Sequence, residues 1–241
     1  PEADIAMTTN GILLPGMAHD LHAAGLDRVN IHLDTLDGER LRQIMRLADL
    51  DRIMAGIEAA TEAGLTPIKL NSVVVKDVND LDVVEMARLT IDQPIHVRFI
   101  ELMPFGSGEP EEIARQQGVS SEESRQKIES ELGALLPDPS PDPADESRNF
   151  RFENGKGNIG FISPVSDPFC GFCNRVRLSA EGKLLLCLLR DDESDLRSVI
   201  RSGGGVPAIQ DALARAILLK PVGHALDQGI HASRRMHEIG G

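Results

Sequence analysis

The stretch Pro67-Ile-Lys-Leu-Asn-Ser-Val-Val-Val75 is the clearest strand signal in this chain of 241 residues. Its branched aliphatic side chains fit a pleated, buried backbone better than they fit a helix. A helix-spaced segment ends at Gly64 just before it, and helical spacing resumes over residues 81–91. A strand framed by two helices is the repeating unit of a parallel sheet or barrel.

The same alternation of strands and helices continues on both sides of this stretch. Apolar spacing predicts further strands at 5–9, 28–33 and 95–102, and helices at 17–24, 41–47 and 50–63. This order predicts an α/β fold with a parallel sheet or barrel, whose ligands bind where the strands end. Those ends carry the polar residues Thr8, His32, Asp34, Asn71 and Glu101.

The composition narrows the class of protein. Hydrophobic residues make up 41% of the chain and charged residues 26%, as in ordinary globular proteins. The 38 acidic and 25 basic residues give a net charge of −13, which argues against nucleic-acid or anionic-membrane partners, because both are bound through their phosphates. No apolar run approaches the roughly 20 residues of a membrane span, and no signal peptide is evident, so we expect a cytoplasmic protein.

A change of composition predicts two units joined by an insertion. Residues 107–148 hold eleven acidic and four basic side chains, and a capping box at Ser120 and Glu123 predicts one helix there. Four prolines between Pro137 and Pro143 indicate an extended linker. We therefore expect a barrel-like unit at 1–106, an acidic insertion and linker at 107–149, and a C-terminal unit at 150–241. In the C-terminal unit we expect strands at 150–152, 158–162, 176–178 and 184–187, and helices at 195–201 and 207–219.

All three cysteines lie in one segment, Cys170-Gly-Phe-Cys173 and, after thirteen intervening residues, Cys187. An odd number of cysteines does not suit a closed disulfide framework. Three thiolates suit an iron–sulfur cluster with one open iron, whereas structural zinc needs a fourth ligand that this segment does not obviously supply. A redox-active pair and inert buried thiols are the alternatives.

Two arginines follow the cysteine pair directly. In an extended chain, Cys173, Arg175 and Arg177 share one face, which would place two guanidinium groups beside the metal, ready to bind a phosphate. The alternative is that both arginines form a solvated face. Lys69 is a charged residue on a strand predicted to be buried, so it is expected to face the open end of the barrel. The His19 and His22 pair is not expected to bind metal.

The segment from Asp167 to Lys183, with Leu186-Cys-Leu188, closely resembles the second iron–sulfur segment of the GTP 3′,8-cyclase family. These are radical S-adenosylmethionine (SAM) enzymes, also called molybdenum cofactor biosynthesis protein A. Further matches are the sequences at 8–11, 28–34, 68–71, 78–80, 98–106 and 220–224, and the terminal glycines.

The resemblance implies a partial TIM-type barrel that lacks its first strands, followed by a smaller C-terminal α+β unit. It implies that GTP is converted to (8S)-3′,8-cyclo-7,8-dihydroguanosine 5′-triphosphate, the first step of molybdenum cofactor biosynthesis. Cys170, Cys173 and Cys187 would hold a [4Fe-4S] cluster. The residues implied to contact GTP are Thr8, Lys69, Arg175, Val176 and Arg177; Met103 and His32 would contact SAM, and Gly240 and Gly241 would enter the active site.

Two departures from the family pattern lead to further expectations. The family's CxxxCxxC motif, which holds the SAM-cleaving cluster, is absent, and the chain starts at Pro1. We therefore expect an N-terminally truncated chain that is inactive alone and that would need the missing segment for a second [4Fe-4S] cluster. His32 occupies a position where the family usually has serine. The alternative function is that of a degenerate relative that binds GTP and a cluster but has no SAM chemistry. The expected partners are an enzyme that processes the cyclised product and a second copy of the chain.

Overall fold

The computed structural model describes residues 3–45, 47–105, 110–234 and 238–239. It divides into two compact units, which are described separately. Unit 1 comprises Pro1–Leu102 and Gln117–Ser166, and unit 2 comprises Met103–Gln116 and Asp167–Gly241. Among the described residues, no helix has both the length and the apolar character needed to cross a membrane.

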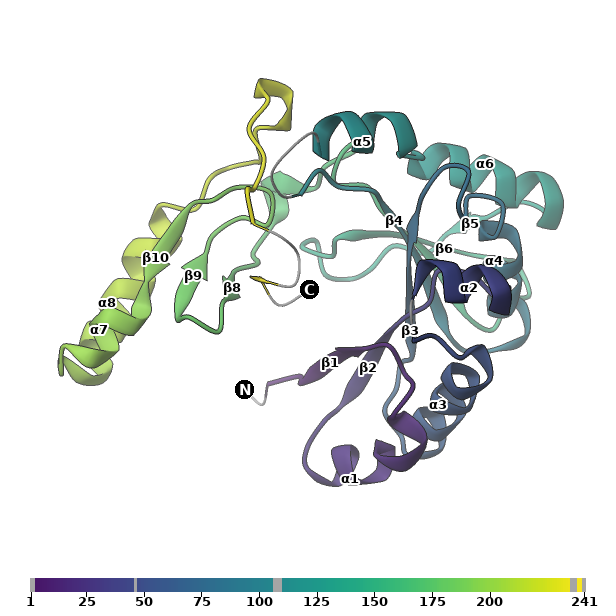
Figure 1. The fold of residues 1–241 in the computed structure, drawn as a ribbon, viewed down its shortest axis with the longest axis horizontal. Coiled ribbons are helices and arrows are strands. Elements are labelled where there is room, and N and C mark those ends of the chain that lie inside the picture. The colour runs from purple at the N-terminus through teal and green to yellow at the C-terminus, as the bar shows by residue number, and fades with distance from the viewer. Residues whose placement is uncertain (1–2, 46, 106–109, 235–237, 240–241) are drawn as a thin grey trace. The chain divides into compact units, whose positions relative to one another are not determined.

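Unit 1 is built on a seven-stranded, mostly parallel sheet (Figure 1). Its strands lie in the order β1 (Ala6–Thr9), β2 (Arg28–His32), β3 (Lys69–Val74), β4 (His96–Glu101), β7 (Asn158–Ile162), β6 (Ser147–Arg151) and β5 (Leu136–Pro137). The first five strands pair in parallel, and the last two pairings are antiparallel. The four strands predicted within residues 5–102, and their α/β arrangement, are confirmed.

The helices of unit 1 supply the other half of its core. They are α1 (Ala18–Ala23), α2 (Gly38–Ile44), α3 (Leu50–Glu62), α4 (Val83–Asp92) and α6 (Ser121–Leu132), with a short 3₁₀ helix η1 (Leu14–Gly16). Ile53 of α3 and Met86 of α4 are fully buried in one core with Ile31, Leu70 and Phe99 of the strands. The helices therefore cover the face of the sheet that carries these buried side chains. Figure 1 shows the helices on one side of the sheet.

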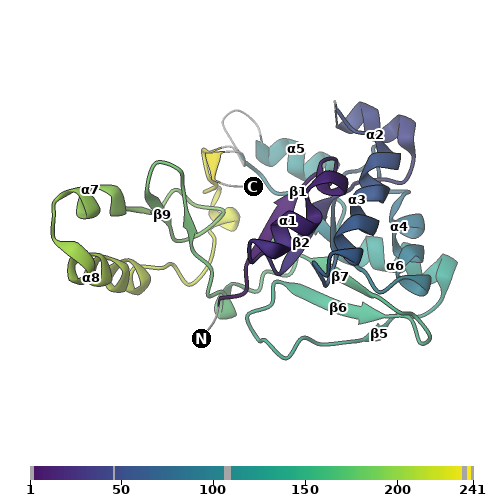
Figure 2. The ribbon, with the colours of Figure 1, turned by 90° about the horizontal axis from the view of Figure 1, so that it is seen from below.

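The boundaries expected at residues 107–149 and 150–241 are corrected by the structure. Strand β7, expected in the C-terminal unit, pairs in parallel with β4 from His96↔Asn158 to Ile100↔Ile162. Helix α6 has the predicted capping box and buries Ile128 completely in the core of unit 1. The proline-rich segment begins as β5, which pairs with β6 (Figure 2). Residues 117–166 thus belong to unit 1. The sequence did not predict this, because strand pairing between distant segments leaves no trace in local composition.

Unit 2 contains a small antiparallel sheet in the order β10 (Glu193–Asp195), β9 (Lys183–Leu185) and β8 (Arg177–Leu178). Its helices are α7 (Leu196–Arg201) and α8 (Gly205–Leu218), both as predicted to within a few residues, and α5 (Pro110–Gln117), which was not predicted. Leu184, Leu186, Leu196 and Ala216 form its core. Two 3₁₀ helices, η2 (Cys170–Phe172) and η3 (Leu226–Gln228), complete it.

Candidate functional site

The cysteine pair of unit 2 lies in a tight turn. Cys170 begins η2, and the N–H of Cys173 donates back to the carbonyl of Cys170 at 3.2 Å, so both thiols sit on one short loop. Cys187 follows β9. All three thiols are free and half-buried. Burial raises the pKa of Cys187, and the neighbouring Cys170 and Cys173 add to the rise, so the three thiols interact electrostatically.

The donor set of this loop fits an iron–sulfur cluster. Among the described residues, no three histidine, cysteine, aspartate or glutamate side chains converge on one metal ion. Three cysteine thiols are the ligand type that an iron–sulfur cluster requires. In addition, His224 Nδ1 accepts the N–H of Leu226 at 3.4 Å, and its Nε2 is buried without a hydrogen-bond partner in the described residues. A neutral imidazole in this state has an unsatisfied N–H donor at Nε2.

The segment that follows α8 lies against the cysteine loop. A Cβ atom at Gly223 would lie 3.5 Å from Cys170 Cβ and 3.8 Å from its Sγ, so glycine permits close approach there. Lys220 Nζ donates to the carbonyl of Arg175 at 2.9 Å and to the carbonyl of Leu186. The sequence matched residues 220–224 to the family without assigning them a role.

The shared face of Cys173, Arg175 and Arg177 stays a prediction. Strand β8 includes only Arg177 and Leu178 of the segment expected to be extended, and η2 precedes it at Cys170–Phe172. The Arg175 guanidinium lies over the Phe169 ring, 5.2 Å from its centroid. Val176 is exposed beside it. Both arginines stay in the same short segment as the cysteines, within unit 2.

In unit 1, Thr8, Lys69 and Asn71 lie on one face of the sheet, and Lys69 is the first residue of β3. Thr8 is in register with Asn30, and Asn30 with Lys69, so the three lie side by side on β1, β2 and β3. Arg98 lies on the same face, where its Nε donates to Asn71 Oδ1 at 2.8 Å. Burial lowers the pKa of Lys69, and the positive charge of Arg98 lowers it further. Lys69 and Arg98 thus place two positive charges on this face, beside the Glu146 carboxylate that pairs with Arg98.

Arg98 is a candidate that the sequence reasoning missed. It is buried, and it also pairs with Glu146 at 2.9 Å. The alternation of His96 and Arg98 with apolar residues along β4 was the available signal, because alternate residues of a strand share a face.

His32 lies at the end of β2 and is held by a neighbour on its own segment. Its Nε2 lies 2.9 Å from Asp34 Oδ2, and Asp34 Oδ1 accepts the backbone N–H of Val73 at 2.9 Å. The hydrogen bond with Asp34 raises the pKa of His32, although burial opposes the rise. Nδ1 is the ring nitrogen that this pair leaves for another partner.

Glu101, at the end of β4, is 5% exposed and has four donors. Oε1 accepts from the N–H of Ser121 at 2.9 Å and from the Ser166 hydroxyl. Oε2 accepts from the N–H groups of Val165 and Ser166 at 3.2 and 2.9 Å. The carboxylate therefore ties β4 to the start of α6 and to the segment just before the cysteine loop.

The remaining predicted residues are less defined. Met103 is half-buried and begins unit 2 directly after Leu102. Gly240 and Gly241 lie outside the described residues.

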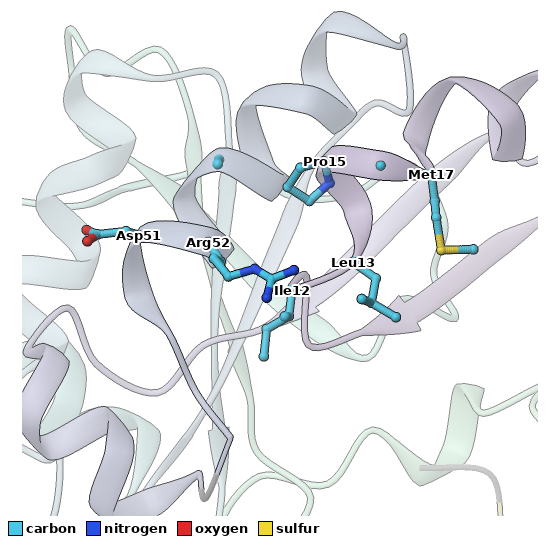
Figure 3. Close-up of a pocket in the computed structure, with 8 residues that line it drawn as sticks. Ile12, Leu13, Pro15, Met17, Asp51 and Arg52 are labelled. Carbon is cyan, nitrogen blue, oxygen red and sulfur yellow. The ribbon is translucent and has the colours of Figure 1, made fainter.

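Figure 3 shows a surface hollow of unit 1 where η1 meets the start of α3, lined by Leu13, Met17 and Arg52 among others. None of the predicted site residues lines it, so we do not assign the active site there.

The matches to known proteins extend over nearly the whole chain. The Radical SAM superfamily matches residues 1–90, and the Molybdenum Cofactor Synthesis C family matches residues 95–226. A GTP 3′,8-cyclase of Heliobacterium modesticaldum is 47% identical in an alignment 241 positions long, which covers 99% of this chain and 73% of that protein. A GTP 3′,8-cyclase of Moorella thermoacetica is 43% identical over 99% of this chain and 72% of its own length. A radical SAM methyltransferase from Sphaerobacter thermophilus is 18% identical, covers 52% of this chain and 37% of its own, and has a TM-score of 0.41, too low to show the fold.

Proposed function

This chain belongs to the GTP 3′,8-cyclase family of radical SAM enzymes in molybdenum cofactor biosynthesis, and on that premise we propose how its residues divide the work. The reaction is the conversion of GTP to (8S)-3′,8-cyclo-7,8-dihydroguanosine 5′-triphosphate with SAM. Unit 1 would be part of a TIM-type barrel, and unit 2 the iron–sulfur unit. The observation that carries this assignment is that Cys170, Cys173 and Cys187 are free and half-buried in unit 2, with the first two on one tight turn.

We assign these three thiols to a [4Fe-4S] cluster. When bound, the cluster supplies an iron with a free coordination position that holds GTP. The buried Nε2 of His224, the residue that directly follows Gly223 beside Cys170, has no hydrogen-bond partner among the described residues and supports a hydrogen-bond acceptor near this loop. Arg175 and Arg177 follow the cysteine pair and would bind the nucleotide through charge-assisted hydrogen bonds, with Val176 against it.

The face of unit 1 that carries Lys69 and Arg98 supports a role for Lys69 and Thr8 in binding GTP. Lys69 and Arg98 repel each other electrostatically, as the lowered pKa of Lys69 reflects. An anion on this face would relieve that repulsion, and a triphosphate carries enough charge to do so. Thr8, in register through Asn30 on the same face, would add a hydroxyl donor.

His32 and Met103 would contact SAM, as the family resemblance implies. Because Asp34 engages Nε2 of His32, the imidazole would present its Nδ1 to the cofactor. With Nε2 donating to Asp34, Nδ1 accepts a hydrogen bond when the imidazole is neutral and donates one, as a serine hydroxyl can, only when the ring is protonated. The diglycine tail, Gly240 and Gly241, would enter the active site as the family resemblance implies.

The partners and location follow from the same assignment. Another enzyme would process the cyclised product, and reduced thiols fit the cytoplasm. A homodimer would cover apolar side chains at the end of α8, where Ile217, Leu218 and Leu219 are largely exposed. Light scattering of the purified chain tests that assembly.

Anaerobic reconstitution is the first test of the proposal. We expect a brown protein with about one [4Fe-4S] cluster per chain, because the 241 residues contain three cysteines and all are assigned to one cluster. GTP should perturb the spectrum of that cluster. Stoichiometric zinc without sulfide would refute the cluster.

Turnover is the second test. The 241 residues by themselves should form no 5′-deoxyadenosine with SAM, GTP and dithionite, because no thiolate is left for a SAM-cleaving cluster. Formation of the cyclised product by these residues alone would refute the cysteine assignment. Joining a segment that carries CxxxCxxC ahead of Pro1 should restore turnover. Failure with both clusters loaded would favour the degenerate GTP-binding relative, which the histidine at position 32 also favours.

A further inference from the structure

We propose that Lys220 is a positioning residue that ties together the two cysteine-bearing segments of unit 2 and balances the negative charge of the cluster bound there. The inference rests on the proposed function, since it assumes the cluster at Cys170, Cys173 and Cys187. It adds a role for a residue outside the ligand set.

The geometry comes from one ammonium group with two backbone acceptors. Lys220 Nζ donates to the carbonyl of Arg175, two residues after Cys173, at 2.9 Å. It also donates to the carbonyl of Leu186, which directly precedes Cys187. Hydrogen bonds from a charged donor are about twice as strong as neutral ones. Lys220 therefore connects the loop that carries two ligands to the strand end that carries the third.

The position of Lys220 is itself fixed by packing. Its backbone N–H donates to the carbonyl of Ile217 at the end of α8. In the same helix, Ala216 is buried in the small core that also contains the side chain of Leu186. Leu186, whose carbonyl accepts the lysine hydrogen bond, thus also packs against the helix that Lys220 follows. This packing holds the lysine backbone near its acceptor.

The charge of Lys220 lies close to the ligand set. Its ammonium contacts the carbonyl of the residue before Cys187 and that of the second residue after Cys173. A [4Fe-4S]²⁺ core with three thiolates carries one net negative charge, and one-electron reduction adds another. A nearby cation stabilises the reduced state more than the oxidised state. Lys220 should therefore make the cluster easier to reduce.

Redox titration of the reconstituted cluster, followed by electron paramagnetic resonance, tests this role. In Lys220→Met, the equilibrium constant for reduction should fall about tenfold, which for one electron is about 59 mV towards lower potential. A chelator should also remove iron faster from this variant. Lys220→Arg keeps the charge and should stay within about twofold of the unaltered chain. Lys183→Met is the matched control, because it removes a lysine of the same unit that pairs with Asp195 and Glu193 instead.

The outcomes separate this inference from the proposed function. If the unaltered chain binds no iron and sulfide, the proposed cluster fails. If it binds the cluster but Lys220→Met has the unaltered potential and iron-release rate, the inference on Lys220 is overturned. A potential in Lys220→Arg as low as that of Lys220→Met also overturns the charge role. If Lys220→Met takes up no cluster, Lys220→Arg must bind one with the unaltered potential, or the inference fails.

Discussion

Replacement of Glu101 by glutamine is the perturbation whose cost follows most directly from the structure. The substitution keeps the size of the side chain but turns one acceptor oxygen into an NH₂ donor. The glutamine amide can take two orientations. The more favourable one keeps its oxygen at the position of Oε2, which accepts from the N–H groups of Val165 and Ser166. The amide nitrogen then faces the N–H of Ser121, at a position where the native oxygen is 2.9 Å away.

The magnitude is the sum of two effects. A buried N–H left without an acceptor costs about 1–3 kcal/mol, and the remaining bonds lose the strength that a charged acceptor gives them. The Ser166 hydroxyl can rotate to accept from the new amide, so it need not add to the cost. We expect Glu101→Gln to lower the free energy of unfolding of unit 1 by about 3 kcal/mol.

Two measurements check this value. The chain has no tryptophan or tyrosine, so urea unfolding is followed by far-ultraviolet circular dichroism rather than by fluorescence. Hydrogen exchange of the amides of Ser121, Val165 and Ser166 should become about a hundredfold faster, since each 1.4 kcal/mol is a factor of ten.

Glu85→Gln is the matched control. Glu85 is 61% exposed and pairs with Arg88 on the surface of α4, where such pairs contribute about 0–1 kcal/mol. If Glu101→Gln differs from this control by less than about 0.5 kcal/mol, and the three amides exchange at unaltered rates, the role of the carboxylate as an anchor is refuted.

Three further predictions concern the site. Cys187→Ser should lose most of the reconstituted iron, because one of three ligands is gone; full retention in iron and sulfide analysis would contradict the assignment. Arg175→Ala and Arg177→Ala should each weaken GTP binding by about 1.5–3 kcal/mol, the range for hydrogen bonds to charged groups, and added salt should weaken the unaltered complex. Unchanged calorimetric affinity would leave both arginines as solvated charges. The Asp34 hydrogen bond raises the pKa of His32 above 6.5, so its stabilising effect is present below that pH and is lost as pH rises through the raised value. Asp34→Asn should lower the imidazole pKa in an NMR titration, and an equal pKa in both proteins would rule out the pairing.

The α/β pattern of residues 5–102 was predictable because its signals are local. Branched residues at 67–75 favour a strand by their shape, and Gly64 ends a helix by its backbone freedom, whatever the rest of the chain does. The three cysteines could also be proposed as a ligand set from the sequence alone, since all three fall in one short segment. Chemistry that depends on residue type and short spacing is visible before folding.

Only the tertiary structure decided that residues 117–166 belong to unit 1 and add three strands to its sheet. Their membership rests on hydrogen bonds between β4 and β7, which lie far apart in the sequence and are joined by backbone groups that every residue carries. Glu101 and Lys220 were overlooked as anchors for the same reason. Their partners are backbone N–H and carbonyl groups of distant residues, and such groups have no signature in a sequence of side chains.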